Sequence, residues 1–147
     1  MAKAPPAPGT FGFRIVKLVT RVNVLVYRTS RGRLGNLGMD LVVLHHRGAK
    51  SNKPRQTPLN SLRDGDDVIL IASYGGAPKS PAWFHNLMAH PDIEIERKGQ
   101  RSPMRARLAN PSERAEWWPR IVEAYGTFAD YQEITEREIP VIICAPR

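Results

Sequence analysis

Apolar and polar residues alternate in short runs along most of this chain, which is the pattern of half-buried β-strands. The clearest run is Asp92–Arg97, where isoleucines alternate with glutamates. Arg63-Asp-Gly-Asp66 separates two other runs and is a strong hairpin signal. We expect six strands, at about residues 40–46, 57–62, 67–73, 92–97, 102–109 and 139–145. The predicted fold is therefore mainly β, a small and largely antiparallel barrel with peripheral helices.

Helical periodicity replaces this alternation in four segments. Pro81 opens one of them, and proline is favoured at the first position of a helix. Asn110-Pro-Ser-Glu113 opens another and has the composition of a helix N-terminus. We expect helices over about residues 11–28, 81–90, 110–125 and 127–136.

The first of these predicted helices is amphipathic and basic. Arg14, Lys17 and Arg21 lie on one stripe, and valines lie mostly opposite them. A cationic helix of this kind can lie on an anionic membrane surface. It can equally pack its apolar face on the core of its own domain. The sequence leaves both interpretations open.

The length of 147 residues suits one domain with a single core. We expect a disordered, Pro/Ala/Gly-rich segment at 1–10, the basic helix and a linker at 11–32, and the barrel domain at 33–147. The net charge of +8 comes from the first part of the chain, because residues 1–55 hold eleven Lys and Arg against one acid. This excess indicates an acidic partner. Since no nucleic-acid-binding motif accompanies it, we expect no nucleic-acid partner.

Several kinds of site are not supported by the sequence. His45 and His46 are adjacent on a predicted strand and so point to opposite faces, and no carboxylate completes a metal site, so we expect no metal. Cys144 lies in an apolar run and is a core residue rather than a nucleophile. A single cysteine, with no apolar run near the roughly 18 residues that span a bilayer, favours a cytoplasmic protein. The basic helix leaves a peripheral place at the inner face of the membrane open.

Two loops rich in small residues carry the candidate binding chemistry. The segment 47–55 follows a strand and holds four cations and no acid, so its side chains and backbone N–H groups can bind a phosphate or a carboxylate. The segment 73–81 follows another strand and leads to Trp83, which can line a planar ring. The alternative is that 47–55 is only a solvated basic turn. Together the two loops favour a planar cofactor that carries phosphate.

The order of the motifs in these loops resembles the deazaflavin-dependent nitroreductase and quinone reductase family of actinobacteria. The motifs are Gly-x-Lys-Ser-x-x-Pro-Arg-x-Thr-Pro-Leu from Gly48, Arg-Asp-Gly-Asp from Arg63, and Ala-Ser-x-Gly-Gly-Ala-Pro-Lys-x-Pro-Ala-Trp from Ala72. The resemblance covers about residues 33–145. It implies a split β-barrel of the flavin-reductase type and coenzyme F420 as the cofactor. A phosphodiester and an oligoglutamate tail make that cofactor an anion that suits a basic loop.

The resemblance also implies roles for single residues. Lys50, Ser51 and Arg55 would bind the phosphate and the tail. Tyr125 or Tyr131 would donate a hydrogen bond, and the proton would come from one of these tyrosines or from water. Asn60 and Phe128 would line the substrate pocket. The other cofactor-binding residues implied are Thr57, Pro58, Ala72, Ser73, Gly75, Gly76, Lys79, Trp83 and Asn86.

Four positions depart from the family pattern. Ala49 and Asn52 replace the usual Arg and Gly of the phosphate loop, and Asn tolerates the left-handed conformation that Gly favours. Phe128 lacks a tyrosine hydroxyl, and Asn60 replaces a frequent aromatic. These departures indicate a substrate other than the nitroimidazoles that some members activate.

The function that the resemblance implies is hydride transfer from reduced deazaflavin to a small acceptor. A quinone or an activated alkene is the favoured acceptor, and nitro compounds are further candidates. The alternative is a non-catalytic carrier of the same fold that binds F420 or a lipid. We expect a monomer or a homodimer.

Overall fold

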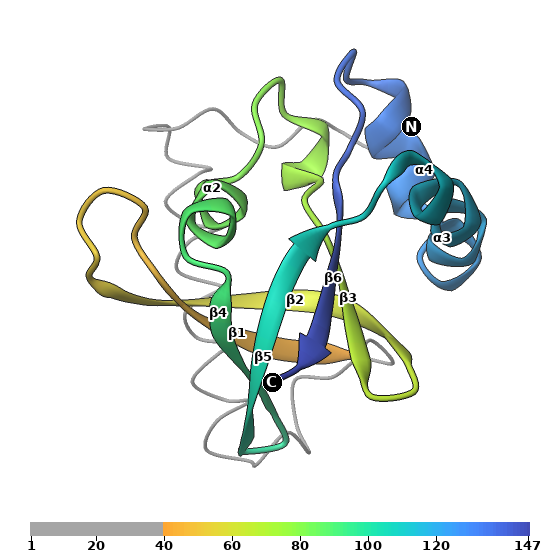
Figure 1. Ribbon diagram of the computed structural model, residues 1–147. Helices are drawn as coiled ribbons and strands as arrows, with labels where there is room; N and C mark the ends of the chain where they lie inside the picture. Colours follow the sequence, from red (N-terminus) through yellow and green to blue (C-terminus); the bar gives the residue numbers. More distant parts are fainter. Residues whose placement is uncertain (1–39) are drawn as a thin grey trace.

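The computed structural model describes residues 40–147, which form a six-stranded barrel (Figure 1). Neighbouring strands pair antiparallel in the closed order β1-β2-β3-β6-β5-β4. The predicted barrel with peripheral helices is thereby confirmed. The segments predicted at 1–10 and 11–32 lie outside the described residues. The strands are β1 Leu41–Arg47, β2 Pro54–Asp64, β3 Asp67–Ile71, β4 Asp92–Arg97, β5 Gln100–Leu108 and β6 Val141–Pro146.

Several strand boundaries differ from the predicted ones by two or three residues. β2 begins at Pro54, three residues before the expected start, because Pro54 pairs with the last residue of β1. β3 ends at Ile71 rather than at residue 73, and β5 begins two residues early, at Gln100. The early start of β2 extends the β1–β2 hairpin and shortens the basic loop that joins the two strands.

The strands bury side chains on both of their faces. Residues such as Leu44, Leu70 and Ile142 point into the barrel, where Trp83 and Leu87 from α2 join them. The alternate residues of β3 and β6 point outward and are covered by the other helices, which explains why these two strands are apolar on both faces. The outer cluster comprises Ile69, Ile71, Ala109, Trp117, Ile121, Phe128, Ile139, Val141 and Ile143.

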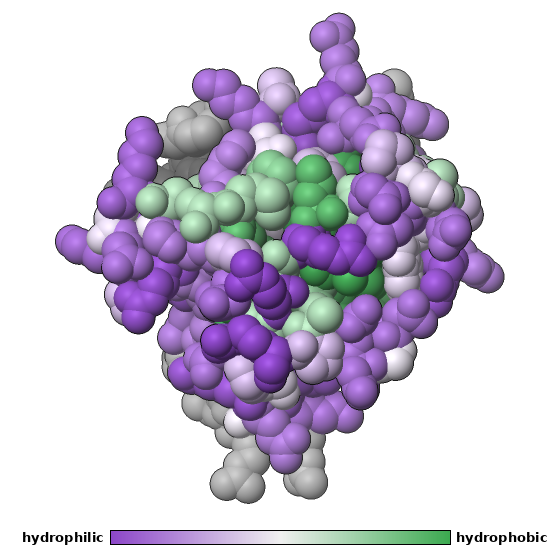
Figure 2. All heavy atoms as spheres, viewed as in Figure 1, coloured by the Kyte–Doolittle hydropathy of each residue, from purple (hydrophilic) through white to green (hydrophobic). Residues whose placement is uncertain are grey.

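In the described part of the chain, three α-helices lie around the barrel: α2 Ala82–Ala89, α3 Pro111–Ala124 and α4 Thr127–Glu133. Asn110 and Glu113 form a capping box at the start of α3, since each side chain accepts a hydrogen bond from the other's backbone N–H (2.8 and 2.9 Å). α4 ends three residues earlier than predicted. On the face seen in Figure 1, apolar side chains gather near the centre and hydrophilic ones surround them (Figure 2). Within residues 40–147, no helix combines the length and apolar character needed to cross a membrane.

A short 3₁₀ turn, η1 (Tyr74–Gly76), fits closely against α4. Gly76 is buried and has φ +79°, and a Cβ there would lie 2.7 Å from Ile134 Cδ1 and 2.8 Å from the carbonyl oxygen of Tyr131. Those distances are well inside van der Waals contact. Gly76 therefore acts as a packing residue that lets η1 approach α4.

We predict that Gly76→Ala destabilises the protein more than Gly65→Ala does. Both glycines have positive φ, so each substitution introduces the left-handed strain of roughly 1–2 kcal/mol. Only at Gly76 does the new methyl group also collide with its surroundings, because nothing lies within 4 Å of a Cβ at Gly65. Overpacking adds roughly 1–3 kcal/mol. Urea unfolding followed by circular dichroism measures both losses, and equal losses would contradict the tight fit of η1 on α4.

Candidate functional site

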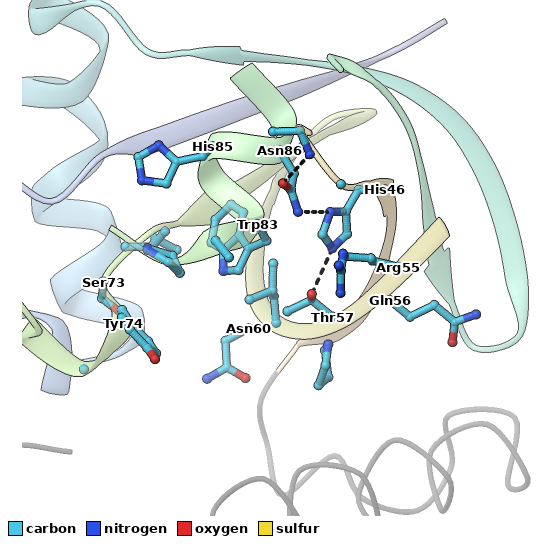
Figure 3. Close-up of a pocket in the computed structure, with 18 of the residues that line it drawn as sticks. His46, Arg55, Gln56, Thr57, Asn60, Ser73, Tyr74, Trp83, His85 and Asn86 are labelled. Carbon is cyan, nitrogen blue, oxygen red and sulfur yellow. Dashed lines mark hydrogen bonds between the residues drawn. The ribbon is translucent and has the colours of Figure 1, made fainter. Parts of the chain in front are cut away.

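One large cavity, of about 1430 Å³, lies beside the barrel and joins a cationic end to an aromatic end. The cationic end is formed by the loop between β1 and β2 with the start of β2. The aromatic end is formed by η1 and α4, and α2 supplies Trp83 (Figure 3). The two loops singled out in the sequence therefore line the same cavity.

The basic loop, Gly48–Lys53, is closed by its own backbone. The N–H of Gly48 donates to the carbonyl of Lys53, and the N–H of Asn52 donates to the carbonyl of Gly48 (both 2.9 Å). Asn52 has φ +54°, so it adopts the left-handed conformation anticipated for this position. Arg47 adds a hydrogen bond from its guanidinium to the carbonyl of Asn52 (3.1 Å). The loop is thus a defined turn that presents Lys50 and Ser51 to the cavity.

A chain of buried and partly buried hydrogen bonds connects this loop to α2. The N–H of Ala49 donates to Asn86 Oδ1 (2.8 Å), which fixes the amide so that Asn86 Nδ2 donates to His46 Nδ1 (3.2 Å). His46 Nε2 then carries the hydrogen and donates to Thr57 Oγ1 (3.0 Å). Thr57 accepts in this bond, so its own hydroxyl hydrogen is left to donate to another group. Figure 3 shows the His46 ring between Asn86 and Thr57.

His46 stays neutral at pH 7. Burial, together with the smaller effects of the charges of Arg55 and His45, lowers its pKa to about 4. A neutral ring has one donor and one acceptor nitrogen, as the bonds to Thr57 and Asn86 require. The protonated ring would oppose the donor of Asn86 with a second donor. The neutral state of His46 is therefore the one that fits the direction fixed by the N–H of Ala49.

Arg137 holds the second loop, which contains η1. Its guanidinium donates to the carbonyl oxygens of Ser73 (2.6 Å), Ala77 (2.9 Å) and Ala72 (3.2 Å). Arg137 is partly buried, and burial lowers its pKa. One cation thus satisfies three carbonyls of a loop more than 55 residues away in the sequence. Sequence reasoning missed this role, because no local pattern links Arg137 to that loop.

The aromatic end of the cavity contains Phe128 and Tyr131 from α4. Their rings meet edge to face at 6.0 Å, and Tyr125 packs on the other side of Phe128 at 5.9 Å. The Tyr125 hydroxyl donates to the carbonyl of Ser61 (2.9 Å) and accepts from the N–H of Asp40 (3.1 Å). Tyr125 does not line the cavity, so its hydroxyl braces the barrel while Tyr131 faces the cavity.

Most of the predicted site residues come together in the cavity, and four do not. Ala72 is fully buried, Gly76 packs on α4, Lys79 is exposed away from the cavity, and Tyr125 braces Ser61. The sequence did not single out His46, Gln56, Tyr74 or His85. Side chains alternate between the two faces of β1, so the sequence could have indicated that His46 lies on the same face as Val42 and Leu44. The predicted residues that line the cavity are Lys50, Ser51, Arg55, Thr57, Pro58, Asn60, Ser73, Gly75, Trp83, Asn86, Phe128 and Tyr131.

The remaining chemistry-bearing residues fit structural roles. Cys144 is fully buried in the barrel, and burial raises the pKa of its thiol to about 12. It is a core residue, as predicted. Among residues 40–147, no three His, Cys, Asp or Glu side chains are grouped so that they could hold a metal ion.

Comparison with known proteins relates this chain to a family. The F420H(2)-dependent quinone reductase from Mycobacterium tuberculosis named Rv1261c is 37% identical over 133 residues, which cover 86% of this chain and 89% of Rv1261c. A solved F420-H2 dependent reductase, FDR-A, is 38% identical with a TM-score of 0.66 and covers 71% of this chain and 93% of its own. A structure titled as a domain-swapped dimer is 35% identical with a TM-score of 0.68 and covers 89% of this chain and 97% of its own.

The family model described as F420H(2)-dependent quinone reductase matches residues 19–146, nearly the whole chain. The expectation of an F420H2-dependent reductase with coenzyme F420 as its cofactor is confirmed at the level of the family. This chain therefore belongs to the F420H(2)-dependent quinone reductase family.

Proposed function

We propose that this protein reduces quinones with F420H2 in the cavity between the basic loop and α4. The observation that carries the proposal is the continuity of the cavity, which joins cations at one end to an aromatic wall at the other. An anionic tail and a planar ring of one cofactor can occupy the two regions together. A second planar molecule can then meet that ring at the aromatic end.

The residues at the cationic end fit the charge of coenzyme F420. Lys50 and Arg55 can make charge-assisted hydrogen bonds to a phosphodiester or to glutamate carboxylates, and the hydroxyl of Ser51 can donate as well. Thr57 has a hydroxyl hydrogen to donate, because its oxygen already accepts from His46. We therefore assign Lys50, Ser51, Arg55 and Thr57 to the phosphate and tail of the cofactor.

The ring of the cofactor would lie beside Trp83, Ser73 and Gly75. Trp83 is 93% buried and packs on the barrel core, so it offers a rigid apolar wall. When bound, reduced F420 supplies the hydride. The protein's share of the catalysis is to align the acceptor, to exclude water and to stabilise charge that develops on the acceptor oxygen. We assign the stabilisation of this charge to the hydroxyl of Tyr131.

Activated alkenes and nitro compounds are further acceptors that we propose for the same site. Asn60 and Phe128 line the region where they would bind. A homodimer is proposed from the solved relative titled as a domain-swapped dimer. We further propose that the enzyme is cytoplasmic. Residues 11–28 would bring it to the inner face of the membrane, where it meets lipid-soluble quinone.

An anaerobic assay tests the activity. We expect the purified protein to convert F420H2 to its oxidised, visibly absorbing form when menadione is added, at a rate proportional to enzyme concentration. Oxygen is excluded so that the quinone is the only acceptor. Tight binding of F420 with no turnover on a panel of quinones, enones and nitro compounds would instead support a carrier. Absence of F420 binding would refute both functions.

The two candidate tyrosines should respond differently to loss of the hydroxyl. We predict that Tyr131→Phe lowers kcat about 100-fold, because a donor to the acceptor oxygen is lost. Tyr125→Phe should leave kcat within about twofold and lower the free energy of unfolding by roughly 1–3 kcal/mol, since two partly buried hydrogen bonds to the backbone are lost. Steady-state kinetics and urea unfolding of both variants measure these effects. If only Tyr125→Phe showed a large loss of kcat, Tyr125 rather than Tyr131 would be the donor to the acceptor oxygen.

A further inference from the structure

Tyr74 combines two unfavourable features at the mouth of the cavity. Its φ is +48°, a left-handed conformation that is uncommon for a bulky residue and costs free energy. It is also 42% exposed, whereas Trp83 and Phe128, which line the same cavity, are each 7% exposed. A glycine or an asparagine would suit this backbone better than a tyrosine. The backbone strain and the exposure of Tyr74 together indicate that its aromatic ring has a function.

The surrounding structure forces Tyr74 into this conformation. Arg137 holds the carbonyls of Ser73 and Ala77 on both sides of it, and the N–H of Ala77 donates to the carbonyl of Tyr74 (3.2 Å). Gly76 fixes the turn against α4. The backbone of η1 is therefore determined by contacts that do not involve the Tyr74 side chain.

The ring of Tyr74 lies on the cavity side of this fixed turn. It lines the cavity together with Trp83, Phe128 and Tyr131, and Figure 3 shows its hydroxyl directed towards the hollow beside Asn60. Within the described part of the chain, the Tyr74 hydroxyl has no hydrogen-bond partner. The side chain thus presents an aromatic face and a polar group that no protein contact in residues 40–147 uses.

We propose that Tyr74 is a specificity-determining residue for the hydride acceptor, and this inference rests on the proposed function. Its ring stacks on the planar ring of a quinone, and its hydroxyl donates a hydrogen bond to a quinone oxygen. The cofactor ring would lie beside the neighbouring Ser73 and Gly75, whereas the side chain of Tyr74 is at the exposed mouth, where η1 packs on α4, which carries Tyr131. We therefore assign Tyr74 to the acceptor rather than to the cofactor. The cations that suit the cofactor tail lie on the other loop.

Two substitutions separate the effect of the Tyr74 ring from the effect of its backbone conformation. Tyr74→Asn removes the ring and suits the left-handed conformation, so we expect it to keep or raise the urea midpoint. The same variant should lower kcat/KM for menadione about 10-fold, mainly through KM, while the Kd for F420 stays within about twofold. Tyr74→Phe is the matched control: it restores the stacking face, and we expect kcat/KM for menadione to recover to within about threefold of the wild type.

The outcomes distinguish this inference from the proposed function. If the wild type reduces menadione and Tyr74→Asn is equally active, the inference is wrong and the proposed function stands. If Tyr74→Asn weakens F420 binding as much as it lowers kcat/KM, the ring contacts the cofactor and the inference is also wrong. A wild type that binds F420 and reduces no quinone would overturn the proposed function and this inference together.

Discussion

The site depends on the amide of Asn86, which is bonded on both sides inside the protein. Its oxygen accepts from Ala49 in the basic loop, and its nitrogen donates to His46 in β1. Because the amide is 93% buried, losing either bond would leave a polar group unpaired, at a cost of roughly 1–3 kcal/mol. Asn86 and Trp83 lie on the same short helix. The basic loop and Trp83 are therefore held in a fixed relation by one side chain.

Arg137 holds the second loop in a comparable way, through three backbone carbonyls. The two anchors come from different elements and act on different loops, so the cavity between them is shaped before any ligand binds. Preorganisation of this kind lowers the cost of aligning two planar molecules for hydride transfer. The strain at Tyr74 is consistent with this view, since a loop fixed from outside can hold a side chain in an unfavourable conformation.

The sequence predicted the barrel because strand alternation and turn residues are local signals. Motif order predicted the family, and most of the residues that it singled out line the cavity. The functions of Asn86, Arg137 and Tyr125 could not be predicted, since each depends on contacts between residues that are 37 to 85 positions apart. Asn86 and Tyr125 were expected to touch ligands, yet their polar atoms bond to the protein. Tyr74 was missed because a positive φ leaves no mark on the sequence when the residue is not glycine.

The central claim is that the cationic end of the cavity binds the anionic part of F420. Its most direct test compares the Kd of F420 with the Kd of the same deazaflavin lacking the phosphodiester and the oligoglutamate tail, at low and at high salt. Our account predicts much tighter binding of F420, an advantage that shrinks with salt and is largely lost in a Lys50→Gln/Arg55→Gln double variant. Equal affinity for the two molecules at low salt, or an advantage that survives the double substitution, would contradict it.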